Sequence, residues 1–311
     1  MKSLKGTSFI LGGTVFWGMS AVVAKLLFDN AAPSDGRPVD TLILVQSRVT
    51  FSFIVMFLVF ALFHRSALRI RPADVHRFML MGVVGIAGSN FTYYFAIQQI
   101  NVSTAILLQY ISPVLVLVFA RLTKQERLTG TKILAASLSI IGCFLAVGGV
   151  SIASGRISAL GLVAGVGAAV CWAFANVYSR HLLNRYSVWT VLVYSFFAAA
   201  IFWSVINPPW DAIHSGYSRG QWLEFAGFAM ISVLIPHSLY FTGVRFVSAS
   251  HAIITGTFEP IVAITGSFLV LGDLLSPAQI AGGVIVVVSI ALLQLKQKDF
   301  REHYTERVEL Q

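Results

Sequence analysis

The sequence predicts an all-α polytopic membrane protein, with ten transmembrane helices arranged as two five-helix repeats of inverted topology. Its 311 residues are 57% hydrophobic and only 11% charged, whereas a soluble domain typically carries about 25% charged residues. Apolar runs of roughly 20 residues, the length of a membrane-spanning helix, recur along the whole chain. One long segment also occurs twice, which indicates that the chain consists of two similar halves.

The internal repeat is clearest around 96–133, which a shift of 147 positions carries onto 243–280 without a gap. Each copy contains an apolar run with a proline near its middle, a short acidic turn and a second apolar run. The repeat divides the chain into a first half at 1–149, a second half at 156–298 and a tail at 299–311. The residues that match under the shift include Ser103 with Ser250, Pro113 with Pro260, Glu126 with Asp273 and Leu128 with Leu275.

Each half contains five apolar runs that are expected to cross the membrane as helices, because the bilayer centre offers no water to unpaired backbone groups. The first run follows two lysines, but it is long for a signal peptide and no small-residue cleavage site follows it. The longest connections, 29–40 and 207–220, contain the Pro, Gly and Asp of irregular loops. The ten expected spans are 8–28, 41–63, 75–97, 102–121, 129–149, 157–179, 188–206, 221–243, 249–271 and 277–295.

The distribution of basic residues predicts the orientation of these spans. Most of the 22 Lys and Arg residues fall in segments on one side of the membrane, while the other side holds only Arg37, Arg156 and Arg219. The positive-inside rule then places both termini in the cytoplasm. We expect the membrane to be the inner (plasma) membrane of the cell. Because each half has an odd number of spans, equivalent spans run in opposite directions, an arrangement typical of secondary transporters.

The composition of the chain and the motifs that it lacks argue against several function classes. The net charge of +9 comes from short loops between apolar runs, so we expect no nucleic-acid partner. Cys143 and Cys171 lie inside apolar runs, and we expect neither a metal site nor a cofactor. The chain has no phosphate-binding loop and no hydrolase motif, which argues against an enzyme. A channel would need a more regularly polar pore than these spans offer.

Glu259 is the most informative polar residue, because charged groups at membrane depth are costly. With His251 and Thr255 it is spaced to lie on one face of span nine. Two roles fit it: binding a proton or a substrate ammonium group, or donating, when protonated, to the Gly256 carbonyl that Pro260 leaves unpaired. Its counterpart in the first half is Ser112, so any role for charge is confined to one half.

A central cavity with aromatic walls and a few polar anchors is expected from residues that share helix faces, as in most small-molecule sites. Trp17 and Trp172 stand at corresponding places in the first spans of the two halves, although single aromatic residues more often only pack. Asn90, Asn176 and His237 are the expected polar anchors. The candidate substrate-binding residues are Trp17, Asn90, Tyr94, Tyr110, Trp172, Asn176, His237, Tyr240 and Glu259.

Two further features leave alternatives open. Pro113 and Pro260 each remove a helical hydrogen bond inside a span, which fits either a hinge or a static bend. Arg48, about eight residues into span two, either extends toward the outer headgroups or binds a substrate carboxylate.

These features together resemble the EamA-like family of the drug/metabolite transporter superfamily. The resemblance is carried by the tryptophan in the first span of each half, the proline in spans four and nine, and two acidic turns. The second turn reads Leu271-Gly272-Asp273, close to the Leu-Gly-Glu of the family, whereas the first reads Lys124-Gln125-Glu126 and is divergent. The resemblance to the family extends over about 8–296.

The resemblance implies a transporter that works by alternating access through a cavity lined by spans one to four and six to nine. Within the family the chain is most similar to bacterial exporters of aromatic amino acids, which implies a small-molecule substrate of that class. The alternatives are a drug or nucleotide-sugar carrier of the same superfamily, or a membrane scaffold that transports nothing. A nucleotide sugar would call for several cations in the cavity, and only Arg48 lies deep enough.

Overall fold

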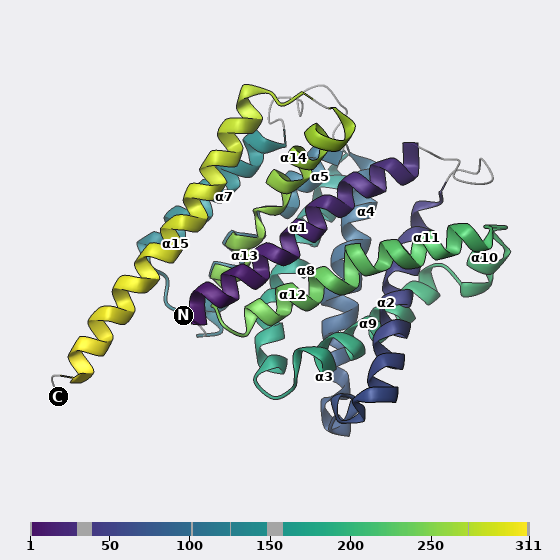
Figure 1. The fold of residues 1–311 in the computed structure, drawn as a ribbon, viewed down its shortest axis with the longest axis horizontal. Helices are drawn as coiled ribbons and strands as arrows, with labels where there is room; N and C mark the ends of the chain where they lie inside the picture. Colours follow the sequence, from purple (N-terminus) through teal and green to yellow (C-terminus); the bar gives the residue numbers. More distant parts are fainter. Residues whose placement is uncertain are drawn as a thin grey trace.

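The chain is helical between short turns, as Figure 1 shows. In the part of the chain that the structure describes, eight helical segments are long and apolar enough to cross a membrane, and Gly130–Ala146 and Pro277–Leu293 are shorter apolar helices, which together make ten. Within the described residues no strand occurs, and the predicted all-α class is confirmed. Gln125 and Asp273 of the two acidic turns fall outside those residues, as does most of the loop 29–40. The computed structural model describes residues 2–29, 39–100, 102–124, 126–147, 158–272 and 274–309.

The helices follow the order that the apolar runs predict, although several spans consist of more than one segment. The first half contains α1 (Lys2–Asp29), α2 (Thr41–Phe63), η1 (Arg65–Leu68), η2 (Pro72–Asp74), α3 (Val75–Leu80), η3 (Met81–Gly88), α4 (Ser89–Gln99), α5 (Val102–Gln109), α6 (Ser112–Leu122) and α7 (Gly130–Ala146). The second half contains α8 (Ala159–Leu183), α9 (Val188–Ile206), α10 (Pro209–His214), α11 (Arg219–Ala229), η5 (Met230–Leu234), α12 (Ile235–Val244), α13 (Ala249–Gly256), α14 (Glu259–Leu271) and α15 (Pro277–Glu309).

Some boundaries differ from those expected. Helix α1 already begins at Lys2, where its first turns pack against α12. Helix α15 continues through the predicted tail as far as Glu309. The expected loop 207–220 contains the short helix α10, whose Pro209 stands at the first helical position, where a missing N–H costs nothing.

Spans four and nine are interrupted at equivalent places. Helix α5 ends at Gln109 and α6 begins at Ser112, while α13 ends at Gly256 and α14 begins at Glu259. The shift of 147 positions carries the first interruption onto the second. In each case a proline occupies the first turn of the following helix, where it cannot donate back to the preceding segment.

The packing between helices repeats when the two halves are exchanged. Helix α1 packs against α12 and α14, and its counterpart α8 packs against α4 and α6. Helix α2 packs against α9, and α7 packs along α15, a pair that Figure 1 shows at the edge of the bundle. This exchange is what two similar halves produce when they assemble around a pseudo-two-fold axis.

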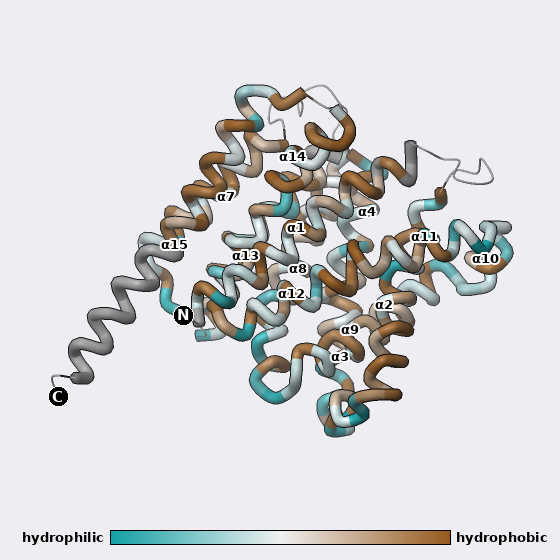
Figure 2. Tube along the Cα trace, in the orientation of Figure 1, coloured by the Kyte–Doolittle hydropathy of each residue, from teal (hydrophilic) through white to brown (hydrophobic). Residues whose placement is uncertain are grey.

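The outer surface of the bundle is apolar, as expected for helices in contact with lipid. Figure 2 shows hydrophobic residues along the helices and hydrophilic ones concentrated at their ends. Large side chains on these outer faces are strongly exposed, among them Leu62 at 70%, Leu223 at 73% and Leu269 at 73%. A monomeric soluble protein rarely exposes so continuous an apolar surface.

Gly18 lets α1 lie directly on the start of α14. A Cβ atom at this position would come within 2.7 Å of the Glu259 carbonyl oxygen and within 2.6 Å of the Val262 Cβ. Because no larger residue fits there without a backbone shift, the glycine holds Trp17, its neighbour in the chain, close to the interruption in span nine.

Candidate functional site

Four of the predicted site residues form an aromatic cluster where α1, α8 and α12 meet. The Trp17 ring centroid lies 5.8 Å from that of Trp172, 5.1 Å from His237 and 5.2 Å from Tyr240. Trp172 in turn lies 5.6 Å from Tyr240. These separations and tilted or edge-on geometries are those that aromatic rings prefer. Both tryptophans remain partly exposed, so the cluster presents ring surface to a space that its own packing does not fill.

The polar groups of this cluster form hydrogen bonds with other residues of the protein. Tyr240 Oη donates to Asn176 Oδ1 at 2.5 Å, and Asn176 Nδ2 donates to the Trp172 carbonyl at 2.9 Å. His237 Nδ1 lies 2.8 Å from the Val233 carbonyl. Because a carbonyl only accepts, Nδ1 carries the proton, which leaves Nε2 as the ring nitrogen free for another partner. Asn176 thus fixes the position of Tyr240, and His237 keeps the capacity expected of an anchor.

Glu259 lies beside this cluster, at the first position of α14. It interacts electrostatically with the hydroxyl-bearing rings of Tyr93, Tyr110 and Tyr240, and with Arg48. The carboxyl group is partly exposed and makes no hydrogen bond among the described residues. A carboxyl group with no hydrogen-bond partner among the described residues, close enough to three tyrosines for its charge to act on them, is suited to a cationic ligand group or a proton.

The helical face expected to carry His251, Thr255 and Glu259 is interrupted between Thr255 and Glu259. The helix is interrupted after Gly256, so residues on either side of the break are not in helical register. The hydrogen bond from Glu259 to the Gly256 carbonyl, one of its two expected roles, is likewise absent among the described residues.

Arg48 points into the bundle and not toward the membrane surface. Its Nε donates to Ser232 Oγ at 2.9 Å, Nη2 donates to the Ser232 carbonyl at 3.3 Å, and Nη1 donates to Tyr94 Oη at 3.1 Å. The guanidinium also lies over the Phe228 ring, 5.2 Å from its centroid. Arg48 is therefore bonded to neighbouring helices, which favours a role inside the bundle over extension to the outer headgroups.

Two π-helical segments, which the sequence does not predict, supply carbonyl groups to these side chains. They are η3 in span three and η5 in span eight, at corresponding places in the two halves. A π-helical turn departs from the α-helical hydrogen-bond pattern and is often found at functional sites. In η5 the carbonyl groups of Ser232 and Val233 accept from Arg48 and His237, and in η3 that of Ile86 accepts from Asn90.

The structure thus brings most of the predicted site residues together. Trp17, Trp172, Asn176, His237 and Tyr240 are in mutual contact, the charge of Glu259 acts on both Tyr240 and Tyr110, and Tyr94 joins through Arg48. Asn90 bonds within its own span, and no described contact connects it to the cluster. Residues that the sequence did not single out are Tyr93, which stacks edge-on with Tyr94 at 5.5 Å, and Ser232.

A separate hollow of about 210 Å³ lies between α1, α14 and α15. Its lining is apolar apart from Ser267 and Gln279, and it contains none of the predicted site residues. The aromatic cluster, and not this hollow, combines rings with charged groups.

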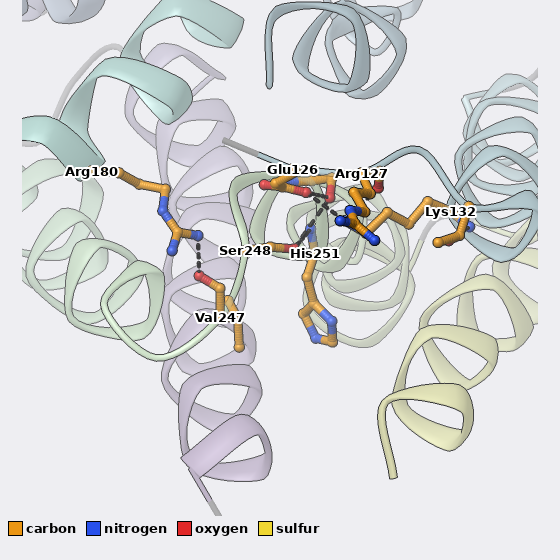
Figure 3. A network of polar contacts seen from close by, with 9 residues as sticks. Glu126, Arg127, Lys132, Arg180, Val247, Ser248 and His251 are labelled. Carbon is orange, nitrogen blue, oxygen red and sulfur yellow. Dashed lines mark hydrogen bonds and ion pairs between the residues drawn. The ribbon is translucent and has the colours of Figure 1, made fainter. Parts of the chain in front are cut away.

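A second polar cluster joins the two halves near one end of the bundle. Glu126, between α6 and α7, accepts hydrogen bonds from Lys132 Nζ at 2.7 Å, from the Ser250 hydroxyl and from the Ser250 N–H at 3.2 Å. His251 Nε2 lies 2.9 Å from Thr7 Oγ1. Figure 3 shows Glu126 above His251, with Lys132 on one side and Arg180, which donates to the Val247 carbonyl, on the other.

The environment of Glu126 keeps it ionised. Burial raises the pKa of this carboxyl group, but hydrogen bonds from Lys132 and Ser250 and the charge of Lys132 together lower it below its usual value. Ser250 stands in the first turn of α13, so the carboxylate also compensates the positive end of that helix. The contact connects the acidic turn of the first half with a helix start in the second half.

Comparison with known proteins agrees with both halves of this architecture. The model of the EamA-like transporter family matches residues 4–148 and 159–295. An uncharacterized inner membrane transporter, YicL of Salmonella typhimurium, is 26% identical over 302 residues, covering 94% of this chain and 96% of its own. A crystal structure at 19% identity superposes with a TM-score of 0.73 and covers 94% of this chain and 96% of its own, which shows the same fold.

Two similar proteins carry named substrates, and these differ. The threonine/homoserine exporter RhtA of Escherichia coli is 24% identical over 228 residues, 71% of this chain and 73% of its own. The riboflavin transporter ImpX of Fusobacterium nucleatum is 24% identical over 206 residues, 63% of this chain and 67% of its own.

Proposed function

The chain belongs to the EamA-like transporter family, and from this premise we propose that it exports amino acids with aromatic or other neutral side chains across the inner membrane. The protein is a membrane transporter of small molecules and not an enzyme. The proposal concerns the substrate, the direction and the mechanism, which is alternating access through the space beside the aromatic cluster.

The observation that carries the proposal is the position of Glu259 near Tyr240, whose ring is in contact with those of Trp17 and Trp172. Aromatic faces pack against apolar and planar side chains, and they also attract ammonium groups. An unpaired carboxyl group next to them adds a specific partner for a substrate ammonium. An amino acid with an aromatic side chain carries both groups on one small molecule.

Alternating access is supported by the bonds that join the halves at one end. Glu126 and Thr7 belong to the first half, and their partners Ser250 and His251 belong to the second. Opening that end, which the distribution of basic residues assigns to the cytoplasm, requires these bonds to break. The same site would then open to either side as the halves move relative to each other.

The similarity to the threonine/homoserine exporter RhtA supports amino acids, whereas that to the riboflavin transporter ImpX supports a planar ligand without an ammonium group. The aromatic cluster would suit both, but Glu259 favours the former. For a drug or nucleotide-sugar carrier, or for a scaffold, no described contact gives comparable support.

The test is counterflow into proteoliposomes that contain the purified protein. We expect saturable exchange of phenylalanine, tyrosine and tryptophan, weaker exchange of threonine and homoserine, and no exchange of riboflavin. Export is tested by uptake of the same amino acids into everted membrane vesicles. Exchange of riboflavin without any amino acid, or of none of these compounds, would overturn the proposal.

A further inference from the structure

Arg48 is a charged residue inside α2 that has no charged protein partner in bonding contact. The groups that hold it, Ser232 Oγ, the Ser232 carbonyl and Tyr94 Oη, are all neutral. No carboxylate forms an ion pair with it anywhere in the described residues. A cation partly removed from water is costly unless an anion compensates it, and an anionic group on a bound ligand would supply that compensation.

The guanidinium also retains free hydrogen-bond donors. It has five N–H groups, and the three bonds to Ser232 and Tyr94 leave two N–H groups without an acceptor among the described residues. A carboxylate binds to a guanidinium through two such donors, and this bond is stronger than one between neutral groups.

Arg48 is held rigidly at the site that contains Glu259. Two of its donors bond to the same residue, Ser232 in the π-helical segment η5, and its flat group lies on Phe228. The neighbouring Ser232 and Val233 carbonyl groups of η5 accept from Arg48 and His237, so Arg48 is held next to the aromatic cluster, and its charge also acts on Glu259. A positive and a negative group therefore stand on different helices around one set of rings.

We propose that Arg48 binds the carboxylate of the transported amino acid while Glu259 faces its ammonium group, so that the site selects a zwitterion. This inference rests on the proposed function and makes it specific. The alternative is that Arg48 only stabilises the π-helical segment. The two differ in what they predict for ligands that lack a carboxylate.

The experiment compares Arg48→Gln with the unaltered protein in counterflow, using phenylalanine and 2-phenylethylamine, which differ only by the carboxylate. The unaltered protein is expected to prefer phenylalanine at least tenfold in KM. In Arg48→Gln the KM for phenylalanine rises about tenfold while that for 2-phenylethylamine stays within about twofold, so the preference disappears; about tenfold is what one lost charged contact costs.

Two further variants make the result interpretable. Arg65→Gln removes an exposed arginine at the start of η1, which among the described residues donates only to the Ala61 carbonyl, and should change neither KM. Arg48→Lys keeps the charge but not the paired donors, and it is expected to reduce the preference for phenylalanine even if Arg48→Gln fails to fold. Circular dichroism and gel filtration in detergent identify any variant that does not fold.

The possible outcomes separate this inference from the proposed function. If the unaltered protein exchanges no amino acid, the proposed function is wrong and this inference is lost with it. If the unaltered protein exchanges phenylalanine but folded Arg48 variants lose phenylalanine and 2-phenylethylamine by the same factor, Arg48 has only a structural role. In that case the proposed function stands and the inference is overturned.

Discussion

Trp17 contacts the rings of three other residues of the predicted site, which are Trp172, His237 and Tyr240. It comes from the first half, and these three partners come from the second. A single side chain thus completes the aromatic surface between the halves. Its counterpart Trp172 occupies the equivalent span of the second half, which is why both tryptophans meet near the pseudo-two-fold axis.

Removing the Trp17 ring should weaken binding of aromatic substrates more than it weakens folding. Each ring–ring contact is worth about 0.5–1.5 kcal/mol, so we expect Trp17→Ala to raise the KM for phenylalanine about tenfold and Trp17→Phe to raise it less. Counterflow in proteoliposomes measures this. Trp210→Ala, which removes a ring in α10 that is 61% exposed, is the matched control. An unchanged KM in Trp17→Ala would show that the ring only packs.

The free energy of unfolding should depend on the protonation of Glu126. Its pKa is lower in the folded protein than in an unfolded chain, because hydrogen bonds from Lys132 and Ser250 outweigh the effect of burial. A group of this kind contributes stability that is fully present above its unfolded pKa of about 4.3. That contribution is lost as the pH falls through the lower folded pKa.

We therefore expect Glu126→Gln to lower the free energy of unfolding at pH 7 by about 1–3 kcal/mol, the cost of losing hydrogen bonds to a charged group. Below pH 4 the difference between the variant and the unaltered protein should shrink. Thermal unfolding in detergent between pH 3.5 and pH 7 measures both effects. Asp211→Asn, at an exposed carboxyl group in α10, should change neither. A difference that grew toward low pH would contradict the assigned direction.

At the scale of elements, the interruptions of spans four and nine are the features that distinguish these helices from simple membrane anchors. Each interruption leaves backbone carbonyl groups outside a regular helical ladder at the level of the site. Broken helices of this kind are tolerated in membranes where they line a cavity or are buried in protein. The π-helical segments in spans three and eight have the same effect on their own carbonyl groups.

Pro260 is expected to act as a hinge that keeps α13 and α14 separate. Pro260→Ala restores a backbone N–H and removes the clash with the preceding turn, so the two helices can join more easily. We expect the initial rate of exchange to fall several-fold while the unfolding temperature stays the same or rises. Pro236→Ala, in the first turn of α12, is the comparison, because η5 runs into α12 without a non-helical residue between them. Equal rates for Pro260→Ala and the unaltered protein would favour a static bend.

At the scale of the whole molecule, the proposed alternating access rests on the exchange of contacts between the halves. The same packing appears twice, once with α1 on α12 and once with α8 on α4. Two near-equivalent arrangements of one site can then have similar free energies, which alternating access requires. In that proposed mechanism, the bonds of Glu126 and Thr7 to the second half would stabilise the arrangement in which that end is closed.

Inverted topology predicts that Thr129, before α7, and Ser276, before α15, face opposite sides of the membrane. Both are exposed, and the shift of 147 positions carries one onto the other. In a chain with Cys143→Ala and Cys171→Ala, we expect a membrane-impermeant maleimide added to intact cells to label Ser276→Cys and not Thr129→Cys. Everted vesicles should give the reverse pattern. Labelling of both from one side would contradict the inverted repeat.

The sequence by itself determined the all-α class, the ten spans and the two halves. These follow from hydrophobicity, the positions of Pro113 and Pro260 and the repeat, all of which are properties of the chain taken in order. It also identified the residue types of the site, because a polar or aromatic residue at membrane depth stands out against an apolar run. The family follows from the same pattern.

Only the tertiary structure decided which of these residues meet. The contact of Trp17 with Tyr240, the bond from Arg48 to Ser232 and the bond from Glu126 to Ser250 join segments far apart in the chain. The π-helical turns and the break before Glu259 also depend on neighbouring helices that satisfy the freed backbone groups. Hydropathy along the chain indicates which residues lie within the membrane, whereas packing in three dimensions determines which residues contact one another.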